Sequence, residues 1–174
     1  MNFIEIVENI RSIKGEKNVP SFDPQNGNEN AKFLFLMEAP GPGAIRSGCV
    51  SFDNQDPTAR NLRIQLAEAG ITRSEIAIWN AVPWYLGNEN FSKIRSPKPA
   101  EIVEARRYLT DVIETMTSLK CIVLVGSHAR RHHLFLSTKV SARIVTCHHM
   151  SAQVANRNAS ASQENIEIFK KMKT

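Results

Sequence analysis

The feature that most constrains the fold is a set of short apolar runs alternating with longer segments of helical periodicity. The runs KFLFLM, EIAIWN and CIVLV are nearly continuous, which is typical of strands buried on both faces of a parallel sheet. Strands that alternate with helices predict an α/β fold, here a three-layer sandwich around a central, mostly parallel four-stranded sheet. We expect these strands at residues 32–37, 75–80, 121–125 and 143–146.

Helix signals fill the segments between these runs. Asp56 before Pro57 has the chemistry of an N-cap followed by a first helical residue, and Gly70 is a stop signal. By contrast, Pro, Gly and Asn mark residues 18–31 and 81–99 as loops, the first a connector without packed elements. Helices are expected at residues 1–17 on the surface, 57–70, 99–118, from Gly126 and from about Ala161.

The size and charge of the chain suit a single domain that tolerates a polyanionic partner. With 174 residues, 42% of them hydrophobic, residues 1–174 are expected to form one domain with its own core. The formal charge of +5 gives a mild attraction to a phosphate backbone, although many proteins without such a partner share it. The three cysteines are too far apart to suggest a disulfide framework, and no apolar run approaches ~20 residues. We therefore expect a cytoplasmic monomer with no membrane contact.

Ligands of parallel sheets bind outside the carboxyl ends of the strands, and the unusual residues of this chain fall there. MEAPG (residues 37–41) follows the first strand, Asn80 ends the second, and HMSAQ (149–153) follows the last. Together with residues 47–62, these segments resemble the uracil-DNA glycosylase superfamily, whose members carry a GEAPG or GQDPY type loop, a strand-terminal Asn and an HPSP loop. The resemblance covers roughly residues 32–157, and it rests on the order and placement of the motifs.

The resemblance implies a DNA glycosylase that flips out a deaminated base, foremost uracil, and hydrolyses its N-glycosidic bond without metal or organic cofactor. Asn80 would pair with uracil O4 and N3–H and reject cytosine; otherwise it is a capping or turn Asn. His149 would donate to uracil O2 as negative charge develops there. Its neighbour His148 could take that role, but only His149 lets Ser151 match the serine of the motif. Glu38 would contact the base through its backbone or position water; the alternative is a solvent-facing carboxylate.

Further residues are assigned to base binding by the same resemblance: Ala39, Pro40, Gly41, Phe52 and Ser151. Phe52 stands where the family places a ring that stacks on the flipped base, although a core Phe would look the same. Gly41 replaces a Tyr with which some relatives exclude the thymine methyl group, so larger pyrimidines are expected to fit. Ala39 replaces the Asp that positions water in the most active relatives, while relatives with A-P-G at this place include active glycosylases.

DNA contacts are expected from two other segments. Gln153 stands where some relatives insert an apolar wedge into the duplex, and the surrounding HMSAQ loop lacks both prolines of HPSP, which makes it less rigid. Ser127, Arg130 and Arg131 follow the third strand and would contact phosphates, unless they are only solvated charge.

No metal site is expected from the sequence. His128 and His132 are four residues apart and could share a metal, but no third ligand is evident near them. The three cysteines also lack the number and spacing of the superfamily members that bind an iron-sulfur cluster.

Two other functions stay open from sequence alone. A non-catalytic member could use the pocket to bind a damaged base or a nucleotide, which Ala39 and the altered HMSAQ loop would favour. A hydrolase of free nucleosides or small N-glycosides is a further alternative, against which the basic loops argue because they suit a polyanion.

Overall fold

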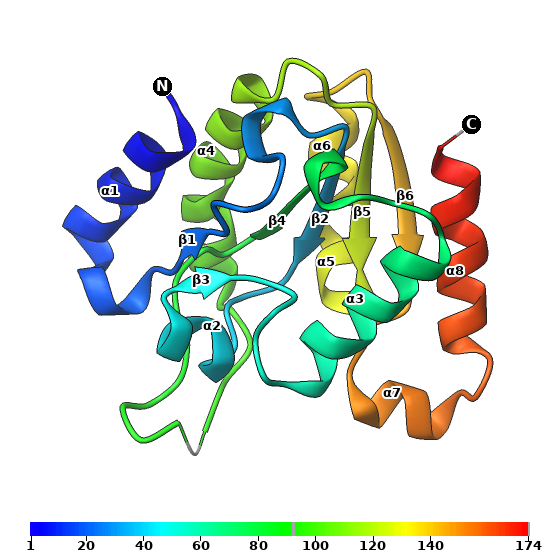
Figure 1. Cartoon of the computed structure of the whole chain (residues 1–174). Helices are drawn as coiled ribbons and strands as arrows, with labels where there is room; N and C mark the ends of the chain where they lie inside the picture. The colour runs from blue at the N-terminus through cyan, green and yellow to red at the C-terminus, as the bar shows by residue number, and fades with distance from the viewer. Residues whose placement is uncertain (92, 174) are drawn as a thin grey trace.

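Four parallel strands form the centre of the molecule (Figure 1). The computed structural model describes residues 1–91 and 93–173. The sheet order is β4-β2-β5-β6, and each neighbouring pair is parallel. These strands confirm the predicted fold class and lie within about one residue of the predicted bounds. They are β2 (Phe33–Met37), β4 (Ile76–Asn80), β5 (Cys121–Val125) and β6 (Arg143–Cys147).

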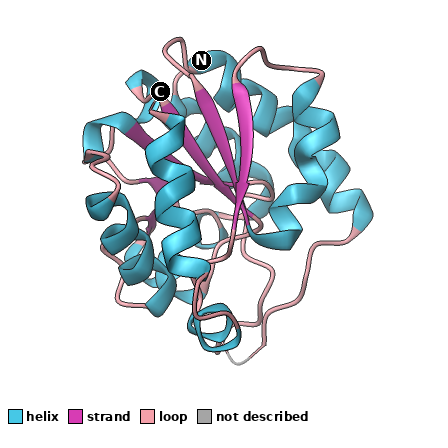
Figure 2. Ribbon diagram, turned by 90° about the vertical axis from the view of Figure 1, so that its right-hand side faces the viewer, coloured by secondary structure: helices cyan, strands magenta, loops and turns pink. Residues whose placement is uncertain are grey.

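Helices cover both faces of this sheet, as the two ribbon views show together (Figures 1 and 2). α1 (Phe3–Lys14) packs against α4 (Pro99–Thr115), and α3 (Pro57–Glu68) packs against α8 (Ala161–Met172). The expected N-cap of α3 is present, since Oδ1 of Asp56 accepts a 3.0 Å hydrogen bond from the Ala59 N–H. After β5 come α5 (Gly126–Ala129), a 3-10 turn and α6 (His133–Ser137). Among the described residues, no helix is long and apolar enough to span a bilayer.

The segment 18–31, predicted as a connector without packed elements, is in fact part of the core. Its strand β1 (Ser21–Phe22) pairs in parallel with β3 (Cys49–Val50). The Phe22 ring stacks between Phe3 and Trp79, with ring centroids 3.9 and 3.8 Å away. Composition indicated a loop because polar turn residues outnumber the few that pack. The burial of one aromatic ring depends on distant partners, which composition does not reveal.

Two short helices were not predicted. α2 (Pro42–Ser47) begins inside the Pro-Gly run that was expected to be only a turn, and α7 (Ala152–Arg157) begins directly after Ser151. Both lie at the end of the molecule to which the strands point (Figure 1). Each is too short to show a helical period, so that periodicity cannot identify it.

Candidate active site

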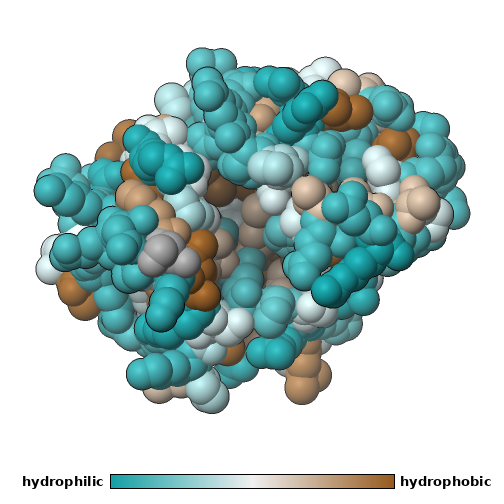
Figure 3. Space-filling view, turned by 90° about the horizontal axis from the view of Figure 1, so that it is seen from below, coloured by the Kyte–Doolittle hydropathy of each residue, from teal (hydrophilic) through white to brown (hydrophobic). Residues whose placement is uncertain are grey.

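A cavity of about 810 Å³ opens at the carboxyl ends of the strands. Figure 3 looks at this end of the molecule and shows a hollow with hydrophilic residues around most of its rim and hydrophobic residues along one side. The end of β4 and the segments that follow β2, β5 and β6 reach it, because the carboxyl ends of parallel strands meet at one edge. The sequence-predicted residues that line it are Glu38, Ala39, Pro40, Gly41, Asn80, Ser127, His149, Ser151 and Gln153.

Asn80 forms the floor of this site at the end of β4. It is paired in register with Met37 of β2, and its side chain is only 2% exposed. Its Oδ1 atom is buried and has no hydrogen-bond partner among residues 1–91 and 93–173. An unpaired buried acceptor costs roughly 1–3 kcal/mol, which a ligand with a well-placed donor recovers. A capping Asn would have this oxygen occupied, so the geometry favours the binding role over the capping role.

His149 is held in one orientation beside the cavity. Its Nδ1 atom accepts a 3.1 Å hydrogen bond from the backbone N–H of Ser151. Burial lowers the pKa of His149 and the nearby His128 lowers it further, against an opposing effect of Asp56. The neutral imidazole is thereby favoured, and because Nδ1 accepts, the proton lies on Nε2. Such a ring can donate a hydrogen bond to an oxygen on which negative charge develops.

His148, the other candidate, faces away from the cavity toward α8. Its Nε2 atom lies 2.7 Å from Oε2 of Glu164. Its backbone N–H and C=O are both bonded to the buried side chain of Asn165, at 2.8 and 3.1 Å. This anchoring by α8 leaves the following residue, His149, to line the cavity.

Gly126, at the start of α5, is required for the position of His149. Its φ of +79° is in the left-handed region, where residues with a Cβ are strained. A Cβ at this position would also lie 3.0 Å from Cβ of His149. The close approach of β5 and the loop after β6 therefore depends on glycine here.

Glu38 lines the cavity with a carboxylate that is partly desolvated, its side chain being 28% exposed. Its Oε1 atom lies 3.0 Å from Nδ1 of His128, which also lines the cavity. Burial raises the pKa of Glu38, while His128 and Arg131 act to lower it. The backbone carbonyl of Glu38 accepts a 2.9 Å hydrogen bond from Val82, so the carboxylate, not the carbonyl, is its available group.

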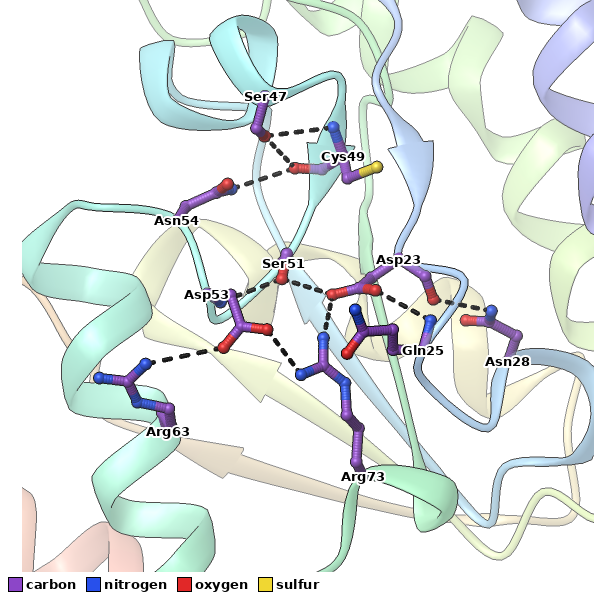
Figure 4. Close-up of polar contacts among 10 residues, drawn as sticks. All are labelled: Asp23, Gln25, Asn28, Ser47, Cys49, Ser51, Asp53, Asn54, Arg63 and Arg73. Carbon is purple, nitrogen blue, oxygen red and sulfur yellow. Dashed lines mark hydrogen bonds and ion pairs between the residues drawn. The ribbon is translucent and has the colours of Figure 1, made fainter.

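The loop after β3 supplies part of the cavity wall and is fixed by a buried acid. Asp23 is 5% exposed and binds both Ser51 Oγ and the Arg73 guanidinium (Figure 4). Arg73 also donates a 2.6 Å hydrogen bond to Asp53, and Asn54 donates one of 3.0 Å to the Cys49 carbonyl. Because Ser51 and Asn54 line the cavity, this network positions part of its wall.

A protein-family model described as the uracil DNA glycosylase superfamily matches residues 24–173, which is most of the chain. The chain belongs to the uracil DNA glycosylase superfamily. Among solved structures it is similar to a putative uracil DNA glycosylase from Methanosarcina acetivorans, with a TM-score of 0.58 and 14% identity. That match covers 91% of this chain and 99% of the other, and at this identity it establishes the fold alone.

A second solved structure with some similarity is a mutant of the UNG from Nitratifractor salsuginis. The TM-score is 0.44 and the identity 16%, over 84% of this chain and 74% of that one. No curated protein sequence matches the chain. Membership of the uracil DNA glycosylase superfamily confirms the family named from the sequence motifs, and the sheet order confirms the fold class.

Phe52 does not take the place expected from its resemblance to the base-stacking ring of the uracil DNA glycosylase superfamily. It is 9% exposed, and the described residues that line the cavity do not include it. The guanidinium carbon of Arg73 lies 4.5 Å from its ring centroid, so one face of the ring is already covered. The alternative that Phe52 is a core residue fits this position, because the ion pairs of Arg73 with Asp23 and Asp53 direct the guanidinium onto the ring.

The cations at the cavity differ from those predicted. Arg130 and Arg131 are exposed beside the site and are not among the described residues of its wall. Arg130 Nη2 instead approaches the Cys147 carbonyl at 3.4 Å. The cavity wall includes Arg46 on α2 and Arg157 on α7, which the sequence analysis missed with the two short helices. The signals were a Pro at the start of α2 and Ser151 at the cap of α7.

Asp56 also lines the cavity, a position the sequence did not indicate, since this residue was interpreted only as an N-cap. Its Oδ2 atom would lie 2.7 Å from a Cβ at Gly43, which explains the glycine there.

His132 is 3% exposed, and burial with the nearby Arg106 and Arg131 lowers its pKa to about 4. Within the described part of the chain, no three His, Cys, Asp or Glu side chains gather as a metal site.

Proposed function

We propose that the chain is a DNA glycosylase that flips a deaminated base, foremost uracil, into the cavity and hydrolyses its N-glycosidic bond. One observation carries the proposal: the unpartnered, buried amide oxygen of Asn80 and the Nε2-protonated ring of His149 line the same cavity. An amide that pairs with N3–H and O4, and a donor for O2, are the two groups that this reaction requires. Membership of the superfamily supports the same reaction class.

We propose one role for each of three residues that line the cavity. As the bond between C1′ and the base breaks, the electron pair stays on the base, and His149 donates through Nε2 to the oxygen that becomes negative. Asn80 holds the base edge and selects its pattern of donor and acceptor. Glu38 accepts a proton from the water that attacks C1′, in a site where Ala39 offers no carboxylate.

DNA is the proposed partner, and the rim of the cavity has suitable chemistry. The chain carries a formal charge of +5, and Arg46 and Arg157 lie in the cavity wall with Ser127 and Gln153. Phosphate contacts from such side chains position a strand without reading its sequence. Arg130 and Arg131 are exposed nearby and would extend this contact.

We assign the chain to the members with an A-P-G loop and no iron-sulfur cluster. Ala39, Pro40 and Gly41 line the cavity as such a loop requires. Cys121 and Cys147 lie at opposite ends of neighbouring strands, because Cys121 pairs with Arg143 and Val125 with Cys147. These thiols cannot join the ligand set of one cluster.

The direct test is the release of free uracil from oligonucleotides that contain one uracil, supplied single-stranded, opposite A and opposite G. Folded protein, checked by circular dichroism, should release uracil from at least one of them. Absence of release from all three rejects the proposal. Salt-dependent DNA binding without release would then support the non-catalytic binder. Cleavage of free nucleosides that DNA does not inhibit would support a nucleoside hydrolase.

A further inference from the structure

Glu38 and His128 form a pair inside the wall of the cavity. They come from different strand ends, Glu38 after β2 and His128 within α5 after β5, and both line the cavity. Oε1 of Glu38 and Nδ1 of His128 are 3.0 Å apart, and their side chains are 28% and 43% exposed. The contact is close enough for an ion pair, although it is not aligned as a hydrogen bond.

We propose that His128 is a positioning residue of the hydrolytic step, whose imidazole holds the Glu38 carboxylate where it takes up a proton from the attacking water. This inference rests on the proposed glycosylase function and adds a residue to it. From the sequence, His128 was considered only as a metal ligand, through its spacing of four residues from His132, and no third ligand was evident. The structure instead places it against the acid that follows β2.

Glu38 is the better proton acceptor of the two. Its backbone carbonyl accepts a 2.9 Å hydrogen bond from Val82, and the preceding residue, Met37, is the strand partner of Asn80. The backbone from which the carboxylate extends is therefore fixed close to the base-recognition residue. Burial also raises its pKa, which makes it a stronger base than an exposed glutamate.

The step balances without any further reactant. The bond between C1′ and the base breaks, and its electron pair leaves with the base as an anion. A water oxygen forms the new bond to C1′, and the proton that this water loses passes to Glu38. The protonated carboxyl then returns its proton to solvent or to the released base. His128 exchanges no proton in this sequence and acts only through the position and charge of Glu38.

The charged groups around the pair set the expected pH response. Glu38 faces His128 and Arg131, and both lower its pKa. His149, from the loop after β6, faces His128 and also Asp56, from the cap of α3. Removing His128 should therefore raise the pKa of Glu38. Glu38 must be ionised to accept a proton. As the pH is lowered, the activity of the variant should therefore begin to fall at a higher pH than that of wild type.

The experiment compares base release by wild type, His128→Ala and His128→Asn from pH 5 to 9. His128→Ala should lower kcat about tenfold with little change in KM, a part of the loss expected when general-base catalysis is removed. Its acid limb should move to higher pH. His128→Asn places an amide nitrogen near Nδ1, so it should recover much of kcat at high pH while its acid limb stays displaced.

A matched control exists in another loop, directly after β6. His148→Ala breaks a His–Glu contact of 2.7 Å that lies outside the cavity, and it should leave the rate and the pH profile unchanged. Carbon-13 NMR titration of the Glu38 carboxyl gives a measurement that does not depend on activity. Its midpoint should rise in His128→Ala and stay at the wild-type value in His148→Ala.

The outcomes separate the two proposals. Wild-type protein that releases no base rejects the glycosylase function, and the role of His128 in it falls as well. Active wild type with a His128→Ala variant that matches His148→Ala in rate, acid limb and Glu38 titration overturns the positioning role alone. A loss of kcat that Asn fails to restore at any pH would also overturn it.

Discussion

The backbone N–H of Ser151 donates a hydrogen bond of 3.1 Å to Nδ1 of His149. The same serine caps α7, because its Oγ accepts a 3.4 Å hydrogen bond from Val154. The HMSAQ loop lacks the prolines of the related motif and was expected to be less rigid for that reason. Here two hydrogen bonds made by Ser151 hold the loop in place of the proline rings, and His149 still lines the cavity.

Replacing His149 should remove the donor for the developing anion. We expect His149→Ala to lower kcat for base release by well over tenfold, about the loss seen when one oriented donor is removed. Single-turnover release from a uracil oligonucleotide measures this effect. His149→Gln can place an amide N–H near the former Nε2 and should recover part of the rate. Equal rates in wild type and His149→Ala would contradict the role.

Asn80 should show opposite effects on activity and stability. Its buried Oδ1 has no partner among the described residues, so Asn80→Ala removes an unsatisfied acceptor. We expect base release to fall well over tenfold, while the free energy of unfolding stays within about 1 kcal/mol or rises. Urea denaturation and the release assay test both parts. A large loss of stability would mean that the amide supports the fold and not the ligand.

The sheet and the strand-end loops were predictable because their signals are local. β5 was predicted over the residues it occupies, since a continuous apolar run between polar segments has few other structures available. Glu38, Asn80 and His149 could be placed at strand ends from the predicted strand bounds and the order of the motifs. Their meeting in one cavity then follows from parallel topology.

What the sequence did not indicate depends on contacts between distant segments. The orientation of Phe52 is set by Arg73, which in turn is held by Asp23, and no local pattern joins these positions. Arg46 and Arg157 reach the cavity only because two short helices form beside it. Sequence periodicity cannot detect such helices, so the cationic part of the wall was missed.

Gly41 should control which pyrimidines fit. A Cβ at this residue would meet no atom within 4 Å, and its φ of −85° suits any residue, so the backbone accepts a side chain. We expect Gly41→Tyr to fold normally and to fill part of the cavity. Release of 5-methyl and 5-halogenated uracil should then fall more than release of uracil, measured as a ratio of kcat/KM values. An unchanged ratio would show that this position does not face the base.

The ion pair between the buried Asp23 and the partly buried Arg73 should contribute to stability. Arg73→Met leaves the Asp23 carboxylate, 5% exposed, with only uncharged partners, and we expect a loss of about 1–3 kcal/mol in urea denaturation. Arg63 is the matched control, because its contact of 3.6 Å with Asp53 is exposed and Arg63→Met should cost under about 0.5 kcal/mol. Equal losses of stability in both variants would contradict the stabilising role of the contact between Asp23 and Arg73 that Figure 4 shows.

His132 should make the fold sensitive to acid. Burial, Arg106 and Arg131 lower its pKa from 6.5 to about 4. As pH falls below 6.5, the unfolded chain gains a proton that the folded chain does not bind until about pH 4, so the free energy of unfolding decreases across that window. The decrease amounts to about 3 kcal/mol, and it is absent from His132→Leu, which does not titrate. Urea denaturation of both proteins at pH 7 and pH 4.5 measures the difference. The pKa of His149 is also lowered, but His149 is present in wild type and in His132→Leu, so its contribution cancels in the comparison. Parallel pH dependences of the two proteins would show that His132 is readily protonated in the folded state.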